Sequence, residues 1–352
     1  MPKAGTTMLD RPWALIRAAF IVGGVVVLAV VIWQLLGVIL LFFGAIVIAT
    51  VLRSLARLIE RILPLSSQWS LALACILILA LVAGFSVVLG AQLSGQISNL
   101  LQQLPQQISA LGDRLGISSL QDMLAEQAQS FAGRGNVVQN IAGYTSGVLG
   151  AAANLILVVV GGVYLAARPN FYFNGCLRIF PASIRGTVSR TAENAGQALR
   201  LWLLGQLLSM LLVGILITAG LSFIGIPSAL ALGVLAGLAE FVPIVGPILG
   251  AVPALLLALA QGGNAFLWTL GLYLLVQQVE SNLIMPLVQR WTVDLPPVLT
   301  LFALLALGVL LGPVGVLLAT PLTVVLYVAV KQLYIRNLLH EPVDVPGENS
   351  GA

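Results

Sequence analysis

The chain has 352 residues, of which 59% are hydrophobic and only 8% are charged. A soluble globular domain carries about 25% charged residues, so this composition excludes an ordinary soluble enzyme and indicates a membrane protein with several spans. The formal net charge of +4 comes from scattered arginines rather than from a basic stripe, which argues against nucleic-acid binding.

The first 90 residues (1–90) are interpreted as an N-terminal unit of three membrane spans. No charged residue lies between Arg17 and Arg53, and the 35 residues between them exceed the roughly 20 that cross a hydrocarbon core of about 30 Å. We therefore expect two closely joined spans near 18–33 and 38–52 with a turn at 34–37. A third span is expected to follow near 69–90.

A Gln- and Ser-rich segment follows at 91–140. An apolar stripe at helical spacing runs through it, formed by Leu93, Ile97, Leu100, Leu104, Ile108, Leu111 and Leu115. The segment is predicted to be an amphipathic extracytoplasmic helix region. It either lies on the surface of the membrane or of its own domain, or it packs between subunits.

Membrane-spanning character returns after residue 140. A fourth span is predicted at 141–167, and a basic cytoplasmic segment at 168–200 separates it from a fifth span at 201–224 that ends at Gly225. A sixth full span is expected near 265–284.

The apolar region from 227 to 260 contains several residues that interrupt helices: Pro243, Gly246, Pro247 and Pro253. Each of its two arms has roughly 14 residues and would be about 21 Å long as helix, which is shorter than the hydrocarbon core. Interrupted backbone at membrane depth must be surrounded by protein or water. We therefore expect a re-entrant helical hairpin here.

A second interrupted region lies at 298–330, where Gly312 and Pro313 form the break and Pro321 follows. One span separates the two regions, so the two hairpins are predicted to enter the membrane from opposite sides, as in inverted-repeat transporters. We expect their breaks to meet around a polar pocket. The region 201–336 is interpreted as a transport core, followed by a C-terminal tail at 337–352.

The basic residues support this topology when both termini are cytoplasmic. Fourteen of the sixteen basic residues then share the cytoplasmic side: Lys3, Arg11, Arg17, Arg53, Arg57, Arg61, Arg168, Arg178, Arg185, Arg190, Arg200, Arg290, Lys331 and Arg336. The remaining two, Arg114 and Arg134, fall outside.

Two acidic residues lie in apolar membrane segments, Glu240 at the first break and Glu280 near the end of the sixth span. An acid at membrane depth is costly and often marks an ion or substrate path. Gln277 precedes Glu280 by three residues and shares its helix face, and Asn282 adds another polar group. We interpret these four residues as ligands for a small polar solute or a coupling cation. The alternative is that each acid only accepts hydrogen bonds from free backbone amides of a hairpin or pairs with Arg290.

Three C-terminal motifs carry a family resemblance. They are Glu240-Phe-Val-Pro-Ile-Val-Gly-Pro-Ile-Leu-Gly-Ala-Val-Pro253, Gln278-Val-Glu-Ser-Asn-Leu-Ile-Met-Pro286, and Val293-Asp-Leu-Pro-Pro297 followed by Leu-Gly-Pro-Val-Gly and Ala-Thr-Pro. Together they resemble the autoinducer-2 exporter (AI-2E) family of bacterial permeases. The resemblance implies a bacterial cell inner-membrane protein that forms a homo-oligomer, a pentamer in the family, and exports the quorum signal autoinducer-2. Other members are linked to sodium/proton antiport.

The expected function is therefore secondary transport of a small polar solute by alternating access, possible coupling ions being protons or sodium. A sodium/proton antiporter, a small-solute channel and a scaffold role remain as alternatives. An enzyme is not expected, because the only histidine, His340, lies in the tail and no pair of intramembrane aspartates exists. Cys75 and Cys176 form no metal-type motif, so we expect neither a metal nor a cofactor.

Overall fold

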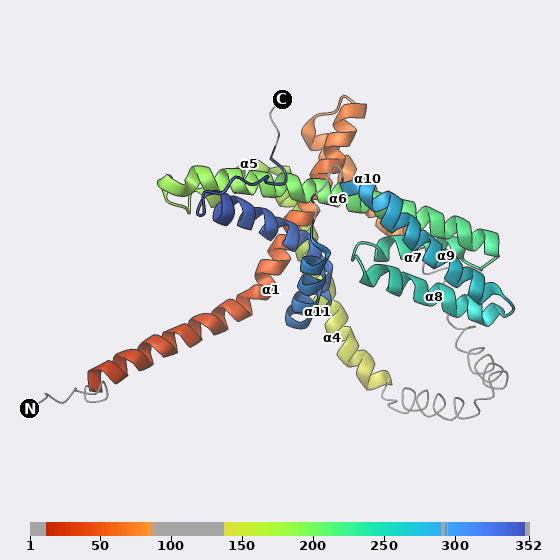
Figure 1. The fold of residues 1–352 in the computed structure, drawn as a ribbon, viewed down its shortest axis with the longest axis horizontal. Helices are drawn as coiled ribbons and strands as arrows, with labels where there is room; N and C mark the ends of the chain where they lie inside the picture. Colours follow the sequence, from red (N-terminus) through yellow and green to blue (C-terminus); the bar gives the residue numbers. More distant parts are fainter. Residues whose placement is uncertain (1–11, 86, 88–136, 290–292, 294, 349–352) are drawn as a thin grey trace, which may run out of the picture.

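The computed structural model describes residues 12–85, 87, 137–289, 293 and 295–348, and every regular element in these ranges is a helix (Figure 1). The predicted all-α class is therefore confirmed for this part of the chain. The apolar stripe of the predicted amphipathic segment lies outside the described residues.

The N-terminal helix α1, Pro12–Ile62, is continuous for 51 residues and forms the long red helix of Figure 1. The turn predicted at 34–37 is wrong. No proline interrupts the helix there, and the single Gly37 costs only about 1 kcal/mol relative to alanine. At 1.5 Å per residue, Arg17 and Arg53 lie roughly 54 Å apart along the helix. The prediction that both arginines lie on one side of the membrane depended on that turn. It therefore loses its support.

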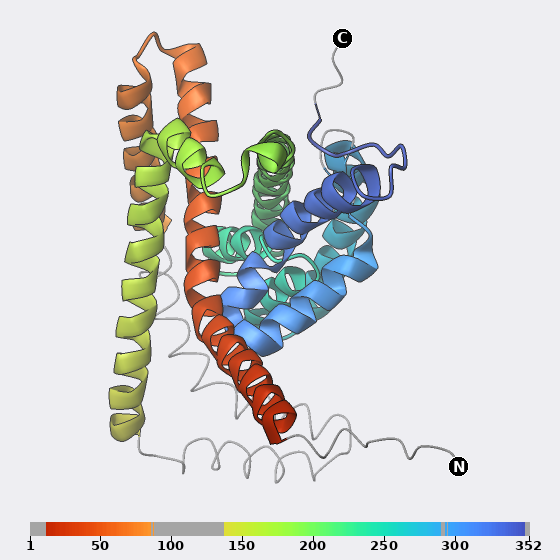
Figure 2. The ribbon, with the colours of Figure 1, turned by 90° about the vertical axis from the view of Figure 1, so that its left-hand side faces the viewer.

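Four helical segments in the described part are long and apolar enough to cross a membrane: Gln34–Ile62 within α1, Ser67–Phe85, α6 (Ala182–Ile224) and Pro297–Arg336. A fifth span results when α4 (Val137–Ala167) and α5 (Pro169–Leu177) are taken together, although they meet at 92°. Pro169 cannot continue α4 and begins a new helix instead. Figure 2 shows α4 beside α1, with α5 crossing above. The chain is thus a multi-pass membrane protein.

Helix α6 is the element around which the C-terminal half packs, since it contacts α7, α9, α11 and α1. It ends where the sequence predicts. Gly225 has φ 83°, and the Ile226 N–H donates to Leu221 O at 2.9 Å, as in a Schellman motif. It begins at Ala182, however, so much of the predicted basic segment belongs to this 43-residue helix.

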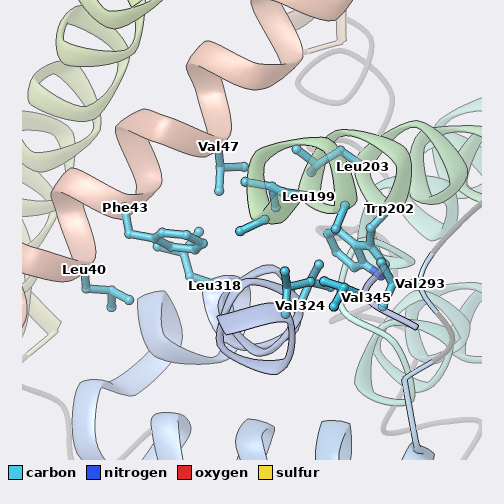
Figure 3. Packing of buried hydrophobic residues seen from close by; sticks show 13 residues of the cluster. Leu40, Phe43, Val47, Leu199, Trp202, Leu203, Val293, Leu318, Val324 and Val345 are labelled. Atoms are coloured by element: carbon cyan, nitrogen blue, oxygen red, sulfur yellow. The ribbon is translucent and has the colours of Figure 1, made fainter. Parts of the chain in front are cut away.

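Large side chains fill the junction of α1, α6 and α11 (Pro297–Ala329), as Figure 3 shows. Phe43 and Val47 of α1 belong to the same buried cluster as Leu199 of α6 and Val324 of α11. Between membrane helices such contacts stabilise through van der Waals packing, because lipid tails are as apolar as the side chains.

The first interrupted region folds as a helical hairpin, with α7 at Ala229–Ala239 and α8 at Val245–Gln261. The break comprises residues 240–244 and contains Pro243. A Cβ on Gly246 would strike Ala239 O, so glycine is needed where the two arms diverge. Pro247 lies in the first turn of α8, which tolerates proline. The prediction that Pro253 also interrupts the helix is wrong, because it lies inside α8.

The second interrupted region turns at one residue, Gly312, whose φ of 65° and ψ of −149° are non-helical. A Cβ on Gly315 would strike Leu307 O. Residues eight apart would be about 12 Å apart along a straight helix, so the chain folds back on itself here. Pro313 follows the break as predicted. Pro321 lies inside the second arm, where no non-helical residue occurs, and its prediction as a breaker is wrong.

The two hairpins do not pack against each other as the sequence analysis expected. Among the described elements, neither α7 nor α8 packs against α11, whereas α6 packs against both α7 and α11. The breaks are linked indirectly, because Phe241 of the first and Leu311 beside the second both contact the cluster of Figure 3.

Candidate functional site

Glu240 caps the C-terminal end of α7 at the start of the first break. Only 3% of its surface is exposed. Its backbone carbonyl accepts a 2.6 Å hydrogen bond from Gln206 Nε2 of α6. That bond fixes the interrupted backbone to the central helix and satisfies a carbonyl that the broken helix would leave free.

Ile244 ends the same break in a strained conformation, with φ 73° and ψ −51°. A β-branched residue at positive φ costs on the order of 1–3 kcal/mol and persists only where the surroundings enforce it. Such strain is concentrated at functional sites, which makes the Glu240–Ile244 loop a candidate for a working part of the molecule.

Glu280 lies where α9 (Ala265–Val279) changes to a π-helical turn, η2 (Glu280–Ile284), before α10 (Met285–Gln289). The Met285 N–H donates to Glu280 O, which is the i to i+5 pattern of a π turn. Pro286 has no N–H for the carbonyl four residues earlier, which favours this local widening. Single π turns inside α-helices occur frequently at functional sites.

Both carboxylate oxygens of Glu280 have a partner, and the side chain is only 7% exposed. Ser209 Oγ of α6 donates to Oε1 at 3.2 Å, and Gln277 Nε2 donates to Oε2 at 3.2 Å. The expectation that Gln277 and Glu280 share a helix face is therefore confirmed, while Gln278 is exposed on another face.

The two predicted acids are brought together, because the carboxyl of Glu280 lies close enough to act on that of Glu240. Two carboxylates close together in a buried place repel each other when both are charged. The arrangement is a pair of buried carboxyls at the place where a broken hairpin meets a π turn.

A cavity of about 170 Å³ lies beside this pair. It is lined by Trp202, Gln206, Pro243, Ile244, Met285, Val293, Leu295, Pro297, Thr300 and Thr320. The first break contributes Pro243 and Ile244, and the second hairpin contributes Thr300 and Thr320. Neither carboxyl lines the cavity, but Gln206 links the cavity to the backbone of the first break, because it lines the cavity and donates to Glu240 O.

Asn282 does not join the site. Its side-chain amide donates to Gln278 O and Gln278 Oε1 at 2.9 and 3.0 Å, and it is exposed on the other face of the helix. Two residues that the sequence analysis missed, Gln206 and Ser209, do join it. Their signal was a polar pair three residues apart within the apolar stretch 201–217.

Tyr273 holds the helix that carries Glu280 against the first hairpin. Its hydroxyl donates to Gly250 O of α8 at 3.0 Å. The side chains of α9 also pack with those of α6, α7 and α8 in one buried cluster that includes Leu232, Ala254 and Val276. The carboxyl pair is thus enclosed by four packed helices.

Interrupted helices, a π turn and buried acids beside an internal cavity define a polytopic membrane protein built around a polar site, as in transporters. The model of the AI-2E family transporters matches residues 23–335. The chain therefore belongs to the AI-2E family of transporters, as the C-terminal motifs indicated.

Several named relatives are similar to this chain over most of their length. YueF of Bacillus subtilis is 28% identical over 302 residues, covering 80% of this chain and 79% of that protein. MT0215 of Mycobacterium tuberculosis is 32% identical over 293 residues, covering 77% and 78%. PerM of Escherichia coli is 26% identical over 231 residues, covering 64% of each. All three are named as candidate transport proteins or permeases. Transporters and permeases are not enzymes.

Proposed function

We propose that this protein is a secondary transporter that moves a small polar solute by alternating access. The observation that carries the proposal is the buried pair of Glu240 and Glu280, at the point where a broken hairpin meets a π turn. Buried acids that face the interior of a helix bundle typically mark ion or substrate pathways.

The cavity supports a solute of modest size. Its volume of about 170 Å³ is smaller than a drug-sized pocket of roughly 300–1,000 Å³. Gln206, Thr300 and Thr320 offer donors and acceptors among apolar walls, which suits a small hydroxylated compound. The quorum signal autoinducer-2 is the candidate that the family name suggests.

The packing of the helices indicates which part of the molecule moves. Helices α6 to α9 share one buried cluster, whereas α1, α4 and the helix Ser67–Phe85 share another. We propose that the elements around the carboxyl pair move relative to the second group, with the re-entrant hairpins entering the membrane from opposite sides. We further propose that Asn282 comes into play only in another state of the cycle, since it is exposed here.

Sodium/proton antiport is the second candidate, and the closeness of the two carboxyls favours it. Two buried acids that exchange a proton for a cation provide the chemistry of an antiporter. We also propose a bacterial inner-membrane location, with the arginine-rich ends of α1 and α6 in the cytoplasm, and a homo-oligomeric assembly.

Flux measurements in proteoliposomes test both candidates. Glu280→Gln and Glu240→Gln keep the shape of each side chain but remove the charge, and Ser281→Ala is the control because Ser281 is exposed and bonds only Gln277 O of its own helix. Loss of solute flux with no sodium-driven pH change would support solute transport. A sodium-driven pH change that both variants abolish would support antiport. Unchanged flux in both glutamine variants would remove the acids from the mechanism.

A further inference from the structure

A second cavity, of about 710 Å³, lies between α1, α4, α5 and α6, away from the carboxyl pair. Its walls are mostly apolar and include Phe42, Phe43 and Ile46 of α1 and Leu165 of α4. At its polar end three arginines line it: Arg53 and Arg57 of α1, and Arg200 of α6. Tyr172 and Phe173 of α5 lie along its side.

The three arginines have no counter-ion within the described part of the chain. The only ion pair found there joins Arg336 to Glu348, far along the sequence. Arg53 and Arg200 instead lie close enough to Arg57 for their positive charges to repel its own, and Glu60 offsets this only in part. Three like charges thus converge on one cavity, an arrangement that an anion would stabilise.

Their hydrogen-bonding capacity is also largely unused. Arg53 Nη1 donates to Ser67 Oγ at 2.8 Å, and Arg57 Nε donates to Arg53 O at 3.3 Å. The Nε atoms of Arg53 and Arg200 are buried without a partner among the described residues. Each guanidinium carries five N–H donors in a planar fork that matches phosphate oxygens, so the free donors fit a phosphate group.

The place of the cavity decides what kind of phosphate it takes. Arg53 and Arg57 lie near the end of the candidate span Gln34–Ile62, where α5 turns away from α4 by 92°. Figure 2 shows α5 at the upper end of α4, with α1 continuing above it. Polar residues at the end of a span meet lipid headgroups, while the apolar wall below them faces acyl chains. Basic pockets between membrane helices are known places for anionic headgroups.

We propose that this cavity, defined by Arg53, Arg57, Arg200 and the apolar residues beneath them, is a binding site for an anionic phospholipid. The phosphate lies against the three guanidinium groups, and one acyl chain follows the wall formed by Phe42, Phe43 and Ile46. The lipid supplies the counter-charge that the described residues do not provide, and it joins α1 to α6.

Native mass spectrometry and thermal unfolding of the full-length protein in detergent test this proposal. Phosphatidylglycerol and phosphatidylcholine are added separately at equal concentrations, together with a third sample that contains inorganic phosphate. We expect phosphatidylglycerol to be retained roughly tenfold more than phosphatidylcholine and to raise the unfolding temperature. Equal retention of the two lipids by the unmodified protein would overturn the proposal without recourse to any variant.

Variants then locate the site. Arg57→Gln combined with Arg200→Gln should abolish the preference for phosphatidylglycerol. Arg190→Gln should leave it intact, because Arg190 is exposed on α6 and does not line the cavity. A preference that survives the double substitution would contradict the proposal.

The same samples also test two other occupants of the cavity. Inorganic phosphate that matches the stabilisation given by phosphatidylglycerol would show a soluble-anion site and refute the lipid. A double variant that loses its oligomeric mass, with no lipid retained by the unmodified protein, would show that a second copy of the chain covers the cavity and would refute it equally.

Discussion

The two interrupted hairpins reach a similar shape by different means. The first, α7 and α8, has a break of five residues that contains an acid and a strained isoleucine, and its glycines press against the backbone of α6. The second turns at Gly312 alone, has no acidic residue between 297 and 336, and packs through large side chains such as Val324. The first hairpin holds a buried acid, Glu240, while the second contributes neutral residues to the cavity wall and to the packing.

The largest effect is expected where the first hairpin meets α6. A Cβ on Gly233 would strike Thr218 Oγ1 and lie 2.8 Å from Gly214 O. Gly233→Ala should therefore lower the free energy of unfolding by about 3 kcal/mol, measured by denaturant titration in detergent. Gly271→Ala is the matched control, because its new Cβ meets nothing within 4 Å. Equal losses in both variants would mean that the hairpin is not held by close backbone approach.

The turn of the second hairpin should be nearly as sensitive. Gly312 has a φ of 65° with a strongly negative ψ, a region that side chains with a Cβ avoid. Gly312→Ala should destabilise the protein by about 2 kcal/mol, seen as a lower unfolding temperature. Gly186→Ala, in an open position on α6, serves as the reference. A neutral result at Gly312 would show that the second hairpin does not depend on this conformation.

The first hairpin should respond in the opposite direction to a glycine. Ile244→Gly relieves the positive-φ strain and should stabilise the folded protein by about 1 kcal/mol. The same change at Ile248, in the helical part of α8, should destabilise it by about 1 kcal/mol. Denaturant titrations of the pair measure the contrast. A loss of stability in both would indicate that Ile244 is held in place by packing rather than strained.

The smallest effect should come from the missed residue Ser209. Its hydroxyl donates one hydrogen bond to Glu280, so Ser209→Ala should weaken the site by about 1 kcal/mol and reduce proteoliposome flux by several-fold. Ser222→Ala, whose hydroxyl bonds only Thr218 O of its own helix, should leave flux unchanged. Identical flux for both would place Ser209 outside the transport site.

Much of the fold was predictable where a residue acts locally. The Gly–Pro steps at Gly246 and Gly312 marked both interruptions, and Gly225 marked the end of α6. Prediction failed where the surrounding helices determine the local structure. Pro253 and Pro321 lie inside helices, since surrounding helices can satisfy the backbone groups that proline frees. Gly37 does not break α1, because one glycine costs too little to stop a long apolar helix.

The site itself was only half visible in the sequence. Gln277 and Glu280 are three residues apart, so their contact follows from helix geometry. Ser209 is 71 residues from Glu280, and no local pattern could assign its partner. Asn282 is close to Glu280 in sequence, but residues two apart on a helix point to different faces, and Asn282 is exposed.

Helix α6 also connects the proposed lipid site to the buried carboxyl pair. Arg200, Gln206 and Ser209 lie on this single rigid rod, and six residues, or roughly 9 Å along the axis, separate Arg200 from Gln206. A molecule that clamps the arginine end of the rod also restrains the end that touches the acids. The head-group composition of the surrounding bilayer would then change the rate of transport, although the lipid does not contact the acids.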